Sequence, residues 1–131
     1  MQRSFLCVIL IKKQVLIMSY LKNFSGQILL KIEDSYIKEV SGVIKYKING
    51  DRVQEFSGRT LFVLDGERVK DFYGRTLLFI THDQVKEFSG KIIAKFDSNY
   101  IREFSGVIQY KIDGFLTRRE MMALLALIYA S

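Results

Sequence analysis

Asp51–Gly66 reads DRVQEFSGRTLFVLDG, and this pattern fills six consecutive units of sixteen residues between Ser19 and Gly114. Positions are counted within the unit, so that Ser19 and Asp51 both stand at position 1. Position 8 is always Gly, and in five of the six units Ser precedes it. Positions 3 and 14 are always apolar. Spacing this regular indicates a repeat architecture in which every unit folds in the same way.

Each unit divides into two octets, and each octet is typical of a strand of about six residues followed by a turn of about two. Ser-Gly, Asn-Gly and Asp-Gly pairs favour hairpin turns, because Gly, Asn and Asp tolerate positive φ. The strand positions are rich in Ile, Val, Phe and Tyr, which suit a pleated surface. The glycines expected to shape one set of turns are Gly26, Gly42, Gly58, Gly74, Gly90 and Gly106.

The hydrophobic pattern can be tested against a strand register. Two-residue loops at 57–58 and 65–66 would pair Val53 with Phe62 and Leu64 with Glu67. Positions 3, 10, 12 and 14 then share an apolar face, while positions 4, 9 and 13 share a polar face. The Phe column at position 6 and the acids at position 5 contradict this alternation. A type I turn with a Gly bulge would shift the register by one residue, and both registers stay open.

Residues 115–131 differ from the repeats. Thr117 and Glu120 predict a capping box, and the run MMALLALIYA that follows at 121–130 is composed of apolar helix formers. A helix that is apolar on every side belongs in a protein interior, although a partner-binding or interfacial helix is the alternative. Ten residues cover about 15 Å, which is too short to span a bilayer.

These elements together predict the fold class. We expect a mainly β protein, an antiparallel meander of about twelve short strands that closes or curls around a buried C-terminal helix in the same domain. About twelve strands at a tilt near 40° leave room for one helix on the axis, provided that bulges at the glycines supply the stagger that closure needs. The alternative is a two-sided β-solenoid capped by the helix.

Twelve strands followed by a hydrophobic helix resemble the tubby and LURP-one-related barrel, over 19–130. The repeat text itself, with IREFSG at 101–106, YKIDG at 110–114 and FLTRREMMALL at 115–125, is similar to uncharacterised bacterial proteins built from short repeats. These resemblances imply a fold and no activity.

Residues 1–18 lie outside the repeat. Phe5–Ile11 is an apolar run, which Lys12 and Lys13 follow. We expect an extra strand pair that seals an edge; the alternative is a leader, with Met18 as the true start. The segment shows no signal-peptide cleavage site and no span of sufficient length. A cytoplasmic location is therefore favoured.

The sequence offers no catalytic set. The single Cys and single His exclude a disulfide framework, a Cys-based zinc site and a His cluster. Cys7 is expected to be a structural thiol, and His82 a tolerated turn substitution. The acids at position 5 could form a calcium ladder, but pairing with neighbouring Lys and Arg is the favoured interpretation. We therefore expect no catalytic, cofactor-binding or metal-binding residues, no cofactor and no enzymatic activity.

The net charge of +6 mostly cancels along the chain, because residues 19–114 hold fifteen Lys and Arg against thirteen Asp and Glu. A nucleic-acid partner is accordingly not favoured. Exposed Tyr and Arg at position 2 are typical of interaction surfaces, and the candidates are Tyr20, Tyr36, Arg52, Arg68 and Tyr100.

The sequence thus predicts a structural or macromolecule-binding β-repeat domain that uses its outer face, with a protein as one possible kind of partner. The alternative is a peripheral membrane module, in which basic columns meet anionic headgroups. The lysines of those columns are Lys31, Lys47, Lys95 and Lys111.

Overall fold

The computed structural model describes residues 18–131. The predictions for residues 1–17, including the extra strand pair and the role of Cys7, lie outside this range. The described chain folds into twelve strands and one helix, α2 (Arg118–Tyr129). The strands are β1 (Ser19–Asn23), β2 (Ile28–Glu33), β3 (Tyr36–Lys38), β4 (Ile44–Asn49), β5 (Arg52–Glu55), β6 (Thr60–Asp65), β7 (Arg68–Lys70), β8 (Thr76–Ile80), β9 (Gln84–Glu87), β10 (Ile92–Phe96), β11 (Tyr100–Glu103) and β12 (Ile108–Asp113).

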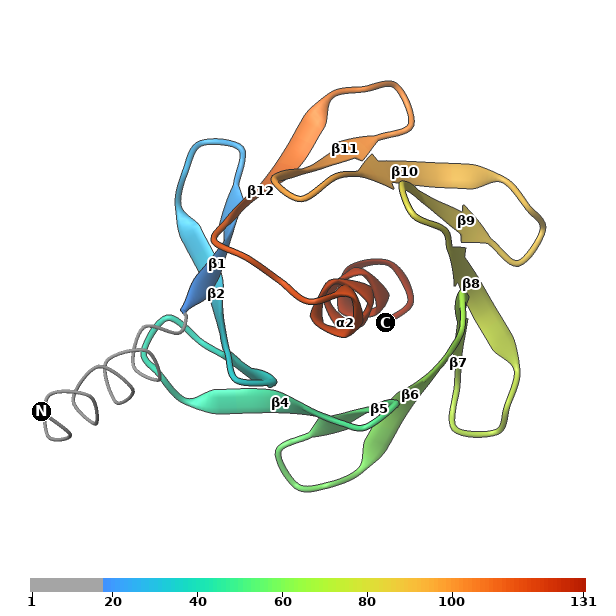
Figure 1. Ribbon diagram of the computed structural model, residues 1–131, viewed down its shortest axis with the longest axis horizontal. Helices are drawn as coiled ribbons and strands as arrows, with labels where there is room; N and C mark the ends of the chain where they lie inside the picture. The colour runs from blue at the N-terminus through green and yellow to red at the C-terminus, as the bar shows by residue number, and fades with distance from the viewer. Residues whose placement is uncertain (1–17) are drawn as a thin grey trace, which may run out of the picture.

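The twelve strands form a closed antiparallel barrel in which every strand pairs with its neighbours in sequence and β12 returns to pair with β1. Helix α2 lies inside this ring and is seen end-on in Figure 1. The predicted barrel around a buried helix is confirmed, and the solenoid alternative is wrong. Closure removes the two free sheet edges that an open meander would expose.

The turns at positions 6–8 of the six repeats are called here the FSG turns, although they read VSG at 40–42 and FYG at 72–74. They are three-residue loops with a Gly bulge, which settles the turn geometry that the sequence left open. At 55–59, the Gly58 amide donates to the Glu55 carbonyl (2.9 Å), and the Glu55 amide donates to the Arg59 carbonyl (2.9 Å). Gly58 has φ of 102°, a conformation that a residue with a Cβ rarely adopts. Every FSG hairpin also contains a second bulge, in which position 11 is the extra residue; Leu61, for example, stands between Thr60, which pairs with Gln54, and Phe62, which pairs with Val53. Bulges at these repeated positions provide the stagger that barrel closure requires.

The bulge also corrects the predicted faces of the sheet. Val53 pairs with Phe62 as expected, but Gln54 then pairs with Thr60, so position 10 lies on the outer face with position 4. Position 11 takes its place, and Leu61, Leu77 and Ile93 pack against the core. The prediction that position 10 faces inward was wrong because one extra residue in the strand reverses the alternation beyond it.

The opposite turns are shifted by one residue from their predicted places. Leu64 pairs with Val69 rather than with Glu67, so the two loop residues are Gly66 and Glu67. This register sets positions 14 and 3 side by side on the inner face. The burial of two apolar side chains for each hairpin therefore decides the register over the preference for Asp-Gly in the loop.

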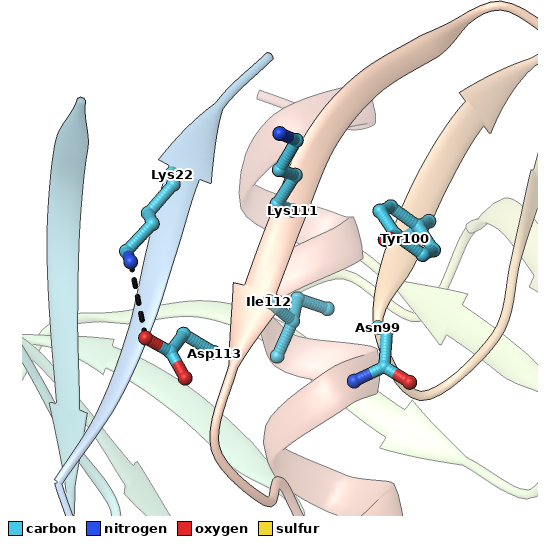
Figure 2. A pocket seen from close by; sticks show the side chains of 6 residues that line it. All are labelled: Lys22, Asn99, Tyr100, Lys111, Ile112 and Asp113. Atoms are coloured by element: carbon cyan, nitrogen blue, oxygen red, sulfur yellow. Dashed lines mark hydrogen bonds and ion pairs between the residues drawn. The ribbon is translucent and has the colours of Figure 1, made fainter. Parts of the chain in front are cut away.

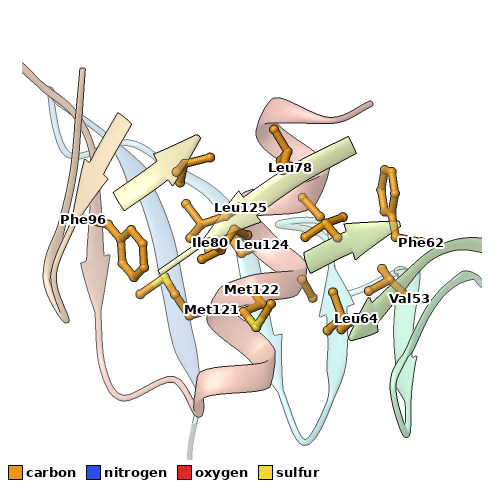
Figure 3. Packing of buried hydrophobic residues seen from close by; sticks show 14 of the residues in the cluster. Val53, Phe62, Leu64, Leu78, Ile80, Phe96, Met121, Met122, Leu124 and Leu125 are labelled. Atoms are coloured by element: carbon orange, nitrogen blue, oxygen red, sulfur yellow. The ribbon is translucent and has the colours of Figure 1, made fainter. Parts of the chain in front are cut away.

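The core lies between the inner wall and α2 (Figure 3). Positions 3 and 14 are buried in every repeat, and Met121–Ala126 are between 0% and 7% exposed. The buried side chains of the inner wall are mostly Ile, Leu, Val and Phe, and Ala94 lies beside the larger Phe96 on β10. The helix is therefore surrounded by apolar side chains on all sides, as its composition predicts.

Helix α2 runs from one rim of the barrel to the other. Its N-terminus carries the predicted capping box: Thr117 Oγ1 accepts from the Glu120 amide (3.1 Å), and Glu120 accepts from the Thr117 amide (3.0 Å). The Arg118 guanidinium donates to the carbonyls of Ile80 (2.9 Å) and Thr81 (3.0 Å) at the end of β8. These contacts attach the start of the helix to the rim opposite the FSG turns.

Candidate interaction surface

The two rims of the barrel differ, and Figure 1 shows that the six FSG hairpins flare outward from the ring. All FSG turns follow odd-numbered strands, so an antiparallel meander places them at one rim, called here the FSG rim. The turns between even-numbered and odd-numbered strands, together with the N-terminus of α2, lie at the opposite rim, called here the capped rim. The outer wall joins the two rims.

The five residues predicted as an interaction surface all lie on the outer wall, because the position 3 side chains beside them point inward. Arg52 and Arg68 are exposed and Tyr36 is 39% exposed, while Tyr20 and Tyr100 are half-buried. They come from five different repeats and are distributed around the barrel. They therefore form a belt on the wall and do not gather into one patch.

Each of these residues faces position 13 of its own repeat across a strand pair, and each pair joins a cation to an aromatic or apolar side chain. The tyrosines face lysines, as in the pair Tyr100 and Lys111, whereas Arg68 faces Phe79. The Arg68 guanidinium carbon lies 5.8 Å from the centre of the Phe79 ring. Pairs of a cation with an aromatic or apolar side chain stabilise a sheet surface. Part of the position 2 pattern therefore serves the sheet itself. The pairs are Tyr20–Lys31, Tyr36–Lys47, Arg52–Val63, Arg68–Phe79 and Tyr100–Lys111.

Charges cancel along the chain but not along the barrel axis. Positions 3–14, which build most of the wall and the FSG rim, hold thirteen of the fifteen Lys and Arg of the repeats and only five acids. The remaining positions lie toward the capped rim, because position 2 pairs with position 15 across the sheet. They hold two cations, Arg52 and Arg68, and eight acids, namely Glu33, Asp34, Asp51, Asp65, Glu67, Asp83, Asp97 and Asp113. Sorting the charges by repeat position would have revealed this polarity, whereas counting them by segment concealed it.

Four ion pairs connect the wall to the capped rim, between a cation at position 4 and an acid at position 15. Lys70 Nζ lies 2.7 Å from Asp65 Oδ2, and this hydrogen bond lowers the pKa of the Asp65 carboxyl below its ordinary value. The others join Lys22 to Asp113, Lys38 to Glu33 and Arg102 to Asp97. Seven wall cations form no ion pair with any residue in the range 18–131, namely Lys31, Lys47, Arg52, Arg68, Lys86, Lys95 and Lys111.

Three of these unpaired lysines face another cation directly across the sheet. Lys111 is the cross-strand partner of Lys22, Lys31 of Lys38, and Lys95 of Arg102. In each pair the position 4 cation has an acid of its own, and the lysine at position 13 has none among the described residues. Like charges at directly opposed sites destabilise a sheet. Lys31 and Lys111 also face tyrosines, and Lys95 Nζ lies 5.8 Å from the centre of the Phe104 ring, so the fold accounts for these three lysines only in part.

The FSG rim carries a ring of exposed aromatic side chains. We call this ring the aromatic crown; its side chains are between 61% and 82% exposed. The two-residue-loop register predicted the Phe column on the polar face of the strands; in the structure these residues are instead the first residues of the three-residue turns. Valines at 40, 43 and 107 are also exposed at this rim. The crown consists of Phe24, Phe56, Phe72, Tyr73, Phe88 and Phe104.

The acids at position 5 also lie at the FSG rim, and each forms hydrogen bonds within its own hairpin. Asp71 accepts from the backbone amides of Tyr73 and Arg75 (both 2.9 Å) and pairs with the Arg75 guanidinium at 2.7 Å. The pKa of the Asp71 carboxyl is below its ordinary value, chiefly because the carboxylate accepts a hydrogen bond from the Arg75 amide. Glu55 pairs with Arg59 in the same way. Local hydrogen bonds therefore account for position 5.

The last turn of α2 reaches the FSG rim, where it is half-buried. Leu127, Ile128 and Tyr129 are partly exposed yet pack against the core. The Tyr129 hydroxyl donates to Gln109 Oε1 at 2.8 Å. Partial burial, with Tyr110 and Glu103 nearby, raises the pKa of Tyr129 to about 12. The centre of this rim is therefore apolar, in contrast to the capped rim.

A shallow pocket of about 260 Å³ lies on the wall at the seam between β1 and β12 (Figure 2). The Lys22–Asp113 ion pair borders it, and Tyr100 and Lys111 line the other side. This volume is below the range of ordinary small-molecule sites. The seam is better suited to contact with a larger surface.

The described chain shows little that could perform chemistry. Within 18–131 there is no cluster of three or more His, Cys, Asp or Glu side chains that could bind a metal ion. The His82 side chain is 91% exposed, and its Nε2 lies 3.6 Å from Asp83 Oδ2 in a turn at the capped rim. No helix in this range has the length and apolar character needed to cross a membrane.

Comparison with protein-family models, with curated proteins and with solved structures finds no match to this chain. The resemblances to the tubby-type barrel and to short-repeat bacterial proteins therefore stay predictions. What the domain does has to be argued from its own surface.

Proposed function

We propose that this protein is a non-enzymatic β-repeat module that binds a macromolecular partner with an anionic surface through its outer wall. The observation that carries this proposal is the set of three unpaired lysines, Lys31, Lys95 and Lys111, each opposed by a second cation. An anionic partner would relieve that repulsion, which the domain reduces only by pairing the second cation with an acid. The Tyr side chains beside Lys31 and Lys111 supply the aromatic contacts that binding surfaces favour.

The test compares salt-dependent retention on immobilised heparin, a polyanion used here as the probe. The triple variant K31E/K95E/K111E reverses three wall charges and lowers the formal net charge from +6 to zero. We expect it to elute at a much lower salt concentration than the parent protein. Because the substitutions also remove three like-charge contacts, we expect its urea midpoint to be equal or slightly higher.

A compensated variant separates the wall from net charge. Adding D51K/E67K/D83K to the triple variant restores the net charge to +6 but places the new cations at the capped rim. Asp51, Glu67 and Asp83 are exposed, so the fold should tolerate the change. We expect heparin retention to stay weak in this variant. Full recovery would show that net charge alone governs binding and would contradict the proposal, as would failure of the parent protein to bind in about 0.1 M salt.

A further inference from the structure

The aromatic crown contributes few contacts to the fold: the centre of the Phe104 ring lies 5.8 Å from Lys95 Nζ, and Phe72 packs edge-on against its neighbour Tyr73. Phe56 and Phe88 are 65% and 70% exposed, and no crown residue belongs to the hydrophobic core or packs against it. Position 6 is the first central residue of a type I turn, a site that accepts most residue types. A polar side chain would therefore satisfy the turn equally well. Of the twelve large hydrophobic residues exposed in the described chain, nine lie in the FSG turns, and such a concentration marks a binding surface.

The surroundings of the crown indicate what it contacts. The crown encircles the half-buried end of α2, so that one rim presents apolar side chains both at its edge and at its centre. Lys45 and Lys91 are exposed at the same rim and form no ion pair with described residues. Aromatic side chains that project beside Lys and Arg are the features with which peripheral proteins enter the interface of an anionic membrane.

The charge polarity of the barrel would orient the crown toward such a membrane. Thirteen of the fifteen repeat cations lie at positions 3–14, on the wall and the FSG rim, whereas the positions toward the capped rim hold eight acids and two cations. An anionic surface attracts the first end and repels the second. The five acids at position 5 do not reverse this preference, because the thirteen cations of positions 3–14 outnumber them, and Glu55 and Asp71 each pair with an arginine of their own hairpin.

We propose that the aromatic crown inserts into the interface of an anionic lipid bilayer, with the barrel axis upright and the capped rim away from the membrane. Lys45 and Lys91 at the FSG rim then face the lipid headgroups, and the wall lysines add long-range attraction to the anionic surface. This inference rests on the proposed function and specifies its partner. A second copy of the chain, the other occupant an apolar rim could accept, is treated below as an outcome of the test.

The chain has no tryptophan, so one introduced indole reports on its own surroundings. Phe88→Trp places it in the crown. Phe115→Trp is the matched control, because Phe115 is 73% exposed but follows β12 at the capped rim. With vesicles of phosphatidylcholine containing about 30% phosphatidylserine, we expect the F88W emission to shift to shorter wavelength. The F115W emission should not move, and neither variant should respond to phosphatidylcholine alone.

Partition onto the same vesicles, measured by co-sedimentation, tests the energetic role of the rings. We expect F56S/F88S to lower the partition coefficient about tenfold for each ring removed, the factor that transfer of one Phe side chain from water supplies. Phe115→Ser should leave the coefficient unchanged. Both variants should keep the circular dichroism spectrum and the urea midpoint of the parent, because all three side chains are exposed.

Four results would overturn the inference. If the protein binds heparin but not the anionic vesicles, the partner class is wrong and the proposed function stands. If it binds the vesicles while F88W emission stays constant, the wall adsorbs to lipid without insertion of the crown. If F56S/F88S changes the mass measured by light scattering and not the lipid partition, the crown is a surface for self-association. If neither heparin nor vesicles bind, the proposed function fails as well.

Discussion

The two rims of this barrel are built from the same repeat but differ in what their residues do. At the capped rim, two-residue turns are drawn close to the helix, and the capping box and Arg118 fix the start of α2. At the FSG rim the hairpins bulge and flare, the helix ends half-buried, and aromatic rings face solvent. The comparison suggests that one rim holds the fold together and the other is free for a partner, which leads to five predictions.

The largest effect is expected at the centre of the helix. Leu124 is 0% exposed, so Leu124→Asp places an unpaired charge in the core and should unfold the domain at room temperature. Ile128 lies one turn further along α2, where the helix is half-buried. Ile128→Asp should therefore leave a folded protein with a lower urea midpoint. A folded Leu124→Asp protein would show that the helix is not enclosed.

The next effect compares one glycine from each rim. Gly114, at the seam where the barrel closes, has φ of 110°, and a Cβ built there would lie 2.7 Å from Ser19 Oγ. Gly58 has φ of 102° but open space around it. Gly58→Ala should cost about 1–3 kcal/mol through backbone strain alone. Gly114→Ala should cost more, because it also displaces the Ser19 hydroxyl that donates to the Phe115 carbonyl at 2.7 Å. Urea denaturation measures the free energy of unfolding of both variants. Equal losses would show that the close approach of Gly114 to Ser19, at the seam between β1 and β12, does not stabilise the barrel.

A smaller loss is expected when the helix start is released from the capped rim. Arg118→Ala removes two hydrogen bonds to the carbonyls of Ile80 and Thr81 and should lower the free energy of unfolding by about 1–2 kcal/mol. Arg119 is exposed and forms no hydrogen bond with described residues. Arg119→Ala, the control, should change it by less than about 0.5 kcal/mol. Similar results for the two variants would refute the proposed anchoring.

At the FSG rim, Tyr129 predicts an alkaline transition. Its folded pKa of about 12 lies above the ordinary tyrosine value of 10.0, so folding favours the neutral phenol. The stability that this group contributes is present below pH 10 and is lost as the pH rises toward 12. Ultraviolet titration of tyrosinate should show one late group in the parent protein that is absent from Tyr129→Phe. Identical titration curves would argue against burial of that hydroxyl.

The smallest effect on stability is expected in the crown. Phe88→Ser should change the free energy of unfolding by less than about 0.5 kcal/mol, since an exposed ring contributes little to the core. Phe96 lies on the same hairpin but is 6% exposed, and Phe96→Ser should cost about 3–5 kcal/mol. A large loss from Phe88→Ser in urea denaturation would assign the crown to the fold and remove the basis for its role in binding.

Much of the architecture was predictable because all six repeats follow the same local rules of turn conformation and apolar burial. The sixteen-residue period, the Gly turns, the apolar positions 3 and 14 and the capping box at Thr117 and Glu120 follow from local rules of conformation and burial. The exact turn residues at 65–67 were not predictable from local preference. There the burial gained by pairing Leu64 with Val69 on the inner face outweighed the ordinary preference for Asp-Gly at the centre of a hairpin turn.

The candidate surface was less predictable than the fold. The position 2 residues lie on the outer wall, where Tyr20 and Tyr100 are half-buried, whereas Phe88 and its equivalents lie in three-residue turns and not on the polar face of a strand. The cation pairs, such as Lys95 with Arg102, join neighbouring strands whose register depends on the turn between them. A one-residue uncertainty in a turn is enough to change every cross-strand neighbour.

The sequence by itself determined that six equal hairpins and one apolar helix had to bury each other, because period, turn chemistry and apolar spacing are local properties of the chain. Only the tertiary structure decided which side chains face one another and which rim each turn occupies. Closing the ring converts a position in the repeat into a height along the barrel axis. Charges that cancel along the chain are thereby separated in space, and the phenylalanines come together at one end.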